Sequence, residues 1–117
     1  MLRFLLLRMP AIQDREVTYS NPLGATLTPI RENVWLAERP FYPRLPGLRT
    51  TAVACKAAVV KLSDGLWVHA PVELDPTTKK AVDALGEVKH IVSPNAEHVK
   101  YAQQWIDAYP SATSYSA

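Results

Sequence analysis

The chain has 117 residues, of which 48% are hydrophobic, so it can form one small domain with an ordinary core. Its 13 basic and 11 acidic residues leave a net charge of +2, which is too balanced to indicate a surface for nucleic acid or for a membrane. The single cysteine, Cys55, excludes an intrachain disulfide and an all-cysteine metal site, and its apolar neighbours predict a small buried side chain.

The chain starts with an apolar stretch, residues 1–9, which is interrupted by Arg3 and Arg8 and stopped by Pro10. It is too short to span a bilayer, which needs about 20 apolar residues. We expect a hydrophobic arm that packs on its own domain or on a partner and that can lie near a membrane without crossing it. The alternative is a targeting peptide for a mitochondrion or plastid, because the arm carries arginines and the first acidic residue is Asp14.

Turn signals without a sustained period follow in residues 11–31, so residues 1–32 are interpreted as an N-terminal arm and covering loop, and residues 33–117 as the folded domain. Residues 34–38 predict a strand with Trp35 and Ala37 on one face.

Residues 39–47 hold three prolines and two aromatic residues, Phe41 and Tyr42. Proline lacks the amide hydrogen that helices and central strands need. We therefore expect an irregular connection with aromatic anchors in this region.

The next pair of elements is a predicted hairpin. Residues 57–62 are rich in alanine and valine, residues 63–65 read Ser-Asp-Gly, and residues 66–70 are again apolar. A turn this short joins antiparallel strands, so 57–62 should pair with 66–70.

The part of the chain from Gly65 to Tyr109 predicts the order strand, helix, strand, helix. Asp75 and Pro76 suit the start of a helix that ends at Gly86, residues 88–92 form the second strand, and the turn at 93–95 leads into the last helix. This order is typical of a mainly parallel sheet covered by helices. Residues 112–116 can add one more short strand. The side chains expected in the core are those of Trp67, Trp105, Val92 and Ile91.

Three segments carry a family resemblance: residues 60–72 with their Gly, Leu-Trp-Val-His and proline series, residues 85–95, and His98. Further matches lie at residues 33–35, at Trp105 and at residues 109–110, so the resemblance runs from about Asn33 to the C-terminus. Together they resemble the proteins grouped as domain of unknown function 4336, which are similar to the metallo-β-lactamase superfamily of hydrolases. The resemblance implies an α/β fold with a mixed sheet and two helices, equivalent to about half of an αββα sandwich.

The metal-binding members of that superfamily carry His-x-His-x-Asp-His in the loop after the second core strand. This loop corresponds to residues 94–99, where Pro94 and Ala96 take the places of the first two histidines, His98 that of the aspartate and Val99 that of the last histidine. Only one of these four side chains can donate to a metal, so we expect no bound metal and no cofactor.

The histidines are nevertheless the candidates for a metal site. His98 should lie near the start of the last helix, where the helix dipole favours a neutral imidazole, and a hydrogen bond to its own loop explains it without a ligand role. His69 and His90 fall on separate predicted strands at different depths, whereas a zinc site needs three or four donors. If His69, His90 and His98 come together at the strand ends, the expectation that they bind no metal is reversed. Asp64 and Asp75 are explained by a turn and by a helix cap.

Two functions remain. The first is a non-catalytic structural or interaction module, held as a subunit by other proteins or by another copy of itself and binding no nucleic acid. Its candidate partner contacts are Phe4, Leu5, Leu6, Phe41 and Tyr42, with the exposed sheet edge as the alternative. The second is a fragment of a metal-dependent hydrolase-like protein of unknown substrate. The sequence shows no catalytic residues for it.

Overall fold

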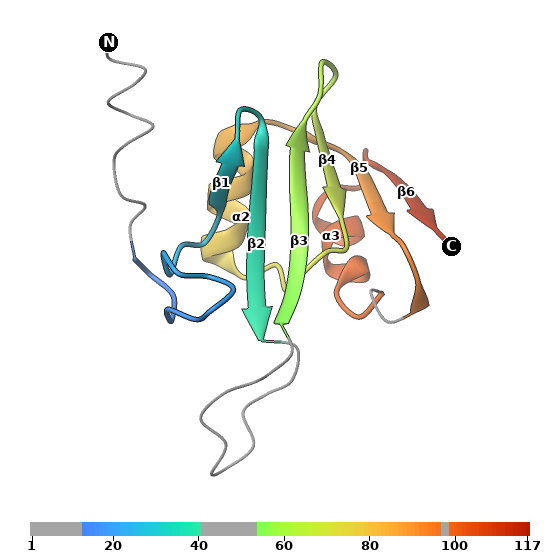
Figure 1. The fold of residues 1–117 in the computed structure, drawn as a ribbon. Helices are drawn as coiled ribbons and strands as arrows, with labels where there is room; N and C mark the ends of the chain where they lie inside the picture. Colours follow the sequence, from blue (N-terminus) through green and yellow to red (C-terminus); the bar gives the residue numbers. More distant parts are fainter. Residues whose placement is uncertain (1–12, 41–53, 97–98) are drawn as a thin grey trace.

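The computed structural model describes residues 13–40, 54–96 and 99–117 (Figure 1). Within these residues the fold is α/β, with one six-stranded mixed sheet and two helices. The elements in chain order are β1 (Thr28–Arg31), β2 (Val34–Pro40), β3 (Ala54–Lys61), β4 (Leu66–His69), α2 (Pro76–Leu85), β5 (Val88–Ser93), α3 (Ala102–Ala108) and β6 (Thr113–Ser116). No helix in the described residues is long and apolar enough to cross a membrane.

The strands lie side by side in the order in which they occur in the chain. The pairings from β1 to β4 are antiparallel, whereas β4 with β5 and β5 with β6 are parallel. The expectation of a mainly parallel sheet is therefore wrong for the described strands. The reason is that the first four strands follow one another antiparallel, and only the two connections that contain α2 and α3 return the chain in the same direction.

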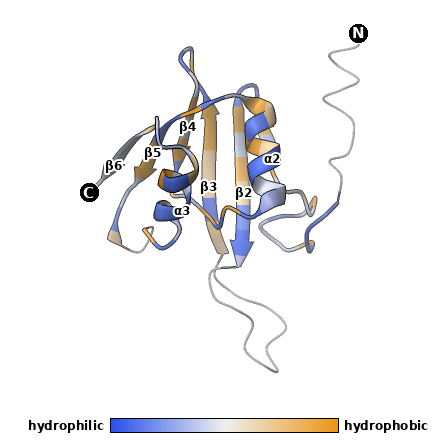
Figure 2. Ribbon diagram, turned by 180° about the vertical axis from the view of Figure 1, so that it is seen from behind, coloured by the Kyte–Doolittle hydropathy of each residue, from blue (hydrophilic) through white to orange (hydrophobic). Residues whose placement is uncertain are grey.

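Both helices lie on the same face of the sheet, as the two opposite views show (Figures 1 and 2). The other face is called the open face below. The helix α2 is placed as predicted: Pro76 is at its first turn, and the Asp75 carboxylate accepts a hydrogen bond from the backbone N–H of Thr78 at 2.8 Å. The helix ends at Leu85, directly before Gly86, which confirms the predicted stop.

The predicted hairpin of β3 and β4 is confirmed, although β3 begins three residues earlier than expected. Its turn closes with a hydrogen bond from the N–H of Leu62 to the carbonyl of Gly65 at 2.8 Å. Gly65 has φ of +146°, and a Cβ there would lie 2.7 Å from the carbonyl oxygen of Glu87. Glycine is thus required where the turn approaches the chain that enters β5.

Two elements differ from the sequence-based expectation. The covering loop expected for residues 11–31 contains β1, joined to β2 by a two-residue turn in which Asn33 adopts a left-handed conformation with φ of 62°. The last helix begins at Ala102 and not directly after residues 93–95, and Ser93 is still paired in β5 and is buried.

The core lies between the sheet and the helices. Its main cluster consists of Val59, Leu66, Val68, Val82, Val88, Ile91 and Trp105. A second cluster continues the core toward the end of β2 and the start of β3. It consists of Ala37, Cys55, Ala57 and Val72. Cys55 is 8% exposed, which confirms the expected buried thiol.

The predicted burial of Trp105 and Ile91 is correct, since each is 1% exposed. The prediction for Trp67 and Val92 is wrong, because both are only half-buried. Their positions in β4 and β5 alternate with the core residues, so they point to the open face.

Candidate functional site

The register of the sheet defines two mainly apolar rows of side chains on the open face, and the charged pair Glu38 and Lys56 lies beside them on β2 and β3. The first row consists of Val34, Val60, Trp67 and His90, which are Cα partners in turn from β2 to β5. The second row consists of Leu36, Ala58, His69, Val92 and Tyr115, partnered in the same way from β2 to β6. Most of these side chains are apolar, so the sheet carries apolar residues on both of its faces.

The two faces differ in how far they are buried. Along β3, Ala57 and Val59 point to the helices and are 0% exposed, while Ala58 and Val60 point to the open face and are half-buried. A solvated sheet face normally carries polar residues at such positions. The open face therefore has the composition of a surface that is built to be covered.

A hollow of about 340 Å³ lies on the β4 to β6 half of the open face. Its lining is mainly apolar and consists of Leu62, Trp67, His90, Val92 and Tyr115. Leu62 is 43% exposed and Tyr115 is 47% exposed, and the other three lining side chains are half-buried, so all five meet solvent. A shallow apolar hollow of this kind can receive a side chain of another protein surface.

His90 is held by hydrogen bonds on both ring nitrogens. Its Nε2 lies 2.9 Å from an Asp64 carboxylate oxygen, and its Nδ1 lies 3.3 Å from the Tyr115 hydroxyl. The hydrogen bond from His90 lowers the pKa of Asp64 below its usual value. Because both nitrogens are engaged, His90 joins the β3–β4 turn to β5 and β6 and offers no free nitrogen to a substrate or a metal.

His69 lies on the same face as His90 but is not part of a common site. The His69 ring stacks on the Trp67 ring, with the ring centroids 5.3 Å apart. His90 is related to Trp67 in another way: the two residues are Cα partners on β5 and β4. Both histidines are half-buried on neighbouring strands of one face, with His90 opposite Trp67 and His69 opposite Val92. His98, the third candidate, lies outside the described residues.

The metal chemistry implied by the resemblance does not fit the donors of this chain. Pro94, Ala96 and Val99 have no side-chain atom that can bind a metal. In the part of the chain that the structure describes, no three His, Cys, Asp or Glu side chains come together as a ligand set.

The five candidate partner contacts, Phe4, Leu5, Leu6, Phe41 and Tyr42, lie outside the described residues. The structure instead points to open-face residues that were missed, above all Val34, Leu36 and Val60. The available signal was that both faces of β2 and β3 are apolar, a pattern typical of strands covered on two sides.

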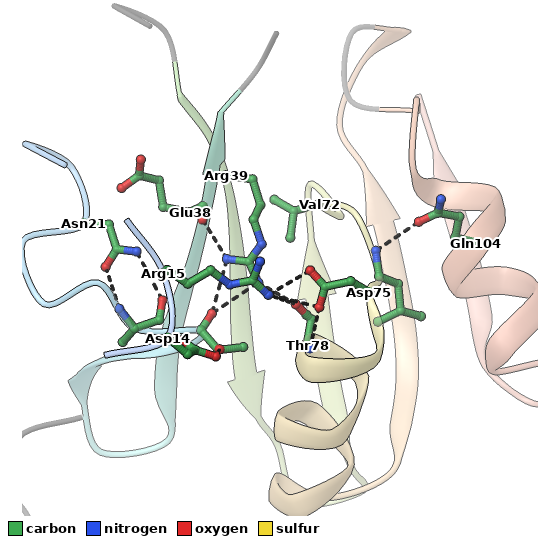
Figure 3. Close-up of polar contacts among 12 residues, drawn as sticks. Asp14, Arg15, Asn21, Glu38, Arg39, Val72, Asp75, Thr78 and Gln104 are labelled. Atoms are coloured by element: carbon green, nitrogen blue, oxygen red, sulfur yellow. Dashed lines mark hydrogen bonds and ion pairs between the residues drawn. The ribbon is translucent and has the colours of Figure 1, made fainter. Parts of the chain in front are cut away.

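A polar cluster at the start of α2 attaches residues 13–27 to the domain (Figure 3). A guanidinium nitrogen of Arg15 donates to both Asp75 carboxylate oxygens, at 2.8 and 3.0 Å, and to the Thr78 hydroxyl at 3.1 Å. Arg39, which is 6% exposed, donates to the same hydroxyl and to the carbonyl of Glu38. Through the Thr78 hydroxyl, the cluster links residues 13–27, β2 and α2.

The charges in this cluster shift the pKa values of its members. Burial alone would raise the pKa of Asp75, but the hydrogen bonds from Thr78 and Arg15 outweigh it and hold the pKa below its usual value. Burial, with the nearby charge of Arg15, lowers the pKa of Arg39. These contacts cap the start of α2 and form the ion pair between Arg15 and Asp75. We therefore assign the cluster a structural role.

The same early segment reaches the other side of β2. Thr18 donates its hydroxyl to the Glu38 carboxylate, with 2.9 Å to each oxygen. Since Glu38 and Arg39 are consecutive in a strand, their side chains leave on opposite faces. Residues 13–27 therefore wrap around the end of β2 and extend the domain beyond the sheet itself.

Comparison with known proteins places most of the chain in one family. The family described as Domain of unknown function (DUF4336) matches residues 31–117. The chain belongs to this family. No curated protein matches the chain.

Proposed function

We propose that this protein is a non-catalytic interaction module, a subunit whose open face is covered by another protein surface. The observation that carries the proposal is the contrast between the faces: α2 and α3 lie on one side only, while apolar side chains occupy both. Apolar surface that is removed from water contributes about 25 cal/mol per Å², so covering the open face is strongly favourable.

The proposal also relates this domain to a larger fold, the αββα sandwich. An αββα sandwich, as in the metallo-β-lactamase superfamily, consists of two sheets face to face with helices on the outside. One helix layer and one sheet correspond to half of such a sandwich. The covering surface would then be a second β-sheet on the open face.

Two observations support a non-catalytic role. Both ring nitrogens of His90 are engaged, and loop residues Pro94 and Ala96 lack metal donors. The alternative function, a fragment of a metal-dependent hydrolase-like protein, needs donors at these positions.

Photo-crosslinking inside the cell that makes the protein tests the proposal. A photoreactive amino acid replaces Lys56, which is exposed in β3 and points to the open face, or Lys80, which is exposed on α2. We expect a crosslinked product of defined mass from position 56 and none, or only a weak smear, from position 80. Equal crosslinking from both positions, or none from position 56, would contradict the proposal.

A further inference from the structure

A second hollow of the domain is a groove along α2, on the side of the sheet that the helices cover (Figure 2). Its volume is about 410 Å³, and it lies between α2 and the segment that leads into β1. Thr77 belongs to the first turn of α2 and Ala84 to its last turn, so the groove follows the helix. The lining is mainly apolar and includes Asp14, Ala25, Leu27, Thr77, Ala81 and Ala84.

The side of α2 that lines this groove lacks the polar residues of a solvated helix surface. The helix buries Thr78 and Val82, and the positions turned away from the core are normally polar. Ala81 is nevertheless only half-buried, and Ala84 is exposed. Because these side chains are small, they leave room between α2 and residues 25–27 that larger apolar side chains can fill.

The chain enters the domain at this groove. Asp14 is one of the lining residues, and its carboxylate accepts a hydrogen bond from the Thr26 hydroxyl. The backbone N–H groups of Asp14 and Arg15 donate to the carbonyl of Gly24, at 3.2 and 3.0 Å. These contacts hold Asp14 at the groove, so residues 1–12 are attached to the domain directly beside it.

We propose that the groove is the docking site of this chain's own N-terminal arm, residues 1–9. Positions 4–7 read Phe-Leu-Leu-Leu, an uninterrupted run of large apolar side chains. Nine extended residues span about 30 Å at about 3.3 Å each, whereas the ten residues of α2 are about 15 Å long at about 1.5 Å each. The run therefore reaches every part of the groove. Arg3 and Arg8 lie on either side of the run and keep their charged ends in water.

The covalent attachment favours the arm over a separate partner of the same chemistry. A segment that is joined to the domain beside its site binds at an effective concentration on the order of 1 mM, which a separate protein would have to reach in solution. Of the two expectations for the arm, packing on its own domain is thus preferred to packing on a partner. Phe4, Leu5 and Leu6 are then not available as partner contacts, which leaves the open face for that role.

Thiol reactivity of the full chain tests the proposal. Ala84→Cys places a thiol in the groove, Gln103→Cys places one at an exposed position of α3, and the native Cys55 is buried. Each variant is made with the natural arm and with the neutral polar arm Leu5→Ser and Leu6→Ser. We expect the polar arm to raise the rate at which the Ala84→Cys thiol reacts with a small maleimide by about tenfold or more. We expect no change for Gln103→Cys.

The controls separate an arm of the same chain from other causes. An arm of the same chain protects Ala84→Cys equally at every protein concentration, whereas the arm of another copy protects more as the concentration rises. Equal rates for Ala84→Cys with both arms would overturn the proposal, as would protection that rises with concentration or an equal increase for Gln103→Cys. Circular dichroism shows whether each variant is folded, and Leu6→Ser alone replaces the double change if that change prevents folding.

The proposal goes beyond the proposed function and fails separately from it. Crosslinking from position 56 reports on the open face, on the other side of the sheet, and does not depend on where the arm lies. A crosslink from position 80 to the chain's own arm adds no mass, so position 80 still serves as the control for a partner. An unprotected groove together with a crosslinked partner at position 56 would remove only the docking of the arm.

Discussion

The two faces of the sheet differ although their residues are similar. Val59 and Val60 are neighbours in β3 and have the same side chain, yet Val59 is 0% exposed beneath the helices and Val60 is half-buried on the open face. The difference in exposure arises because the helices cover the face of Val59 and not that of Val60. The strand itself is the same for both residues. The comparison shows that an apolar strand sequence identifies faces that can be covered, while the handedness of the two connections that contain helices decides which face the chain covers by itself.

Two tryptophans make this comparison measurable. Trp105 of α3 is 1% exposed, and its indole N–H donates to the carbonyl of Val72 at 2.6 Å. Trp67 of β4 is half-buried and stacks on His69. The same substitution at the two positions therefore tests the helix-covered face against the open face.

The largest effect is expected for Trp105→Ala, which should reduce the free energy of unfolding by about 3–5 kcal/mol because it leaves a large cavity in the core. Trp67→Ala should cost less in dilute protein, about 1 kcal/mol, since that ring is only half-buried. Urea denaturation of both variants provides the values. Equal losses at the two positions would remove the distinction between the faces.

The next effect concerns the cluster that anchors residues 13–27 beside the helix-covered face. Asp75→Ala removes the cap of α2 and the ion pair to Arg15. We expect a loss of about 1–2 kcal/mol in the free energy of unfolding. Glu87→Ala, which breaks the exposed ion pair to Lys89, is the control and should cost less than about 0.5 kcal/mol. If the control costs as much as Asp75→Ala, the cluster has no special role.

Acid should weaken the same anchor. The pKa of Asp75 is lower in the folded protein than in the unfolded chain, so its contribution to stability is present above the unfolded value of about 3.9 and is lost as the pH falls through the folded value. The free energy of unfolding should decrease below about pH 4, and by less in Asp75→Asn than in the parent protein. Denaturation at neutral pH and at pH values below 4 provides the comparison. An equal decrease in both proteins would exclude Asp75 as a source of the acid sensitivity.

The smallest effect is expected from metals, and it concerns the loop at residues 94–99. The purified chain should contain far less than one zinc per chain, and chelators should leave its unfolding midpoint unchanged, because loop residues Pro94, Ala96 and Val99 lack donors. Elemental analysis measures the content. About one zinc per chain that is lost in His98→Ala would contradict the interpretation.

Much of the local structure could be predicted from the sequence, because the signals there are local. The cap at Asp75, the stop at Gly86 and the turn at Gly65 all lie where short-range chemistry places them. The strand β1 was missed because its four residues include Pro29 and only one aliphatic side chain, and its pairing with β2 comes from the hairpin turn at Asn33.

The candidate site was harder to predict, because it depends on which face the helices cover. The apolar pattern of Trp67 and Val92 predicted burial, but both belong to the face opposite α2 and α3. The contact of His90 with Asp64 joins residues far apart in the chain and could not be read from their spacing. Register between β4 and β5, which a bulge near Leu66 shifts, decides that His90 and not Lys89 shares the face of Trp67.

The central claim is that the open face is covered when the protein is in its assembly, and hydroxyl-radical footprinting tests it most directly. Oxidation of Trp67 and Tyr115 is measured by mass spectrometry in the native assembly and in the isolated chain at high dilution, with Tyr19, which is fully exposed in the isolated chain, as the internal reference. We expect Trp67 and Tyr115 to be oxidised in the dilute chain and protected in the assembly, while Tyr19 reacts in both. Equal oxidation of Trp67 and Tyr115 in the two samples would contradict the account.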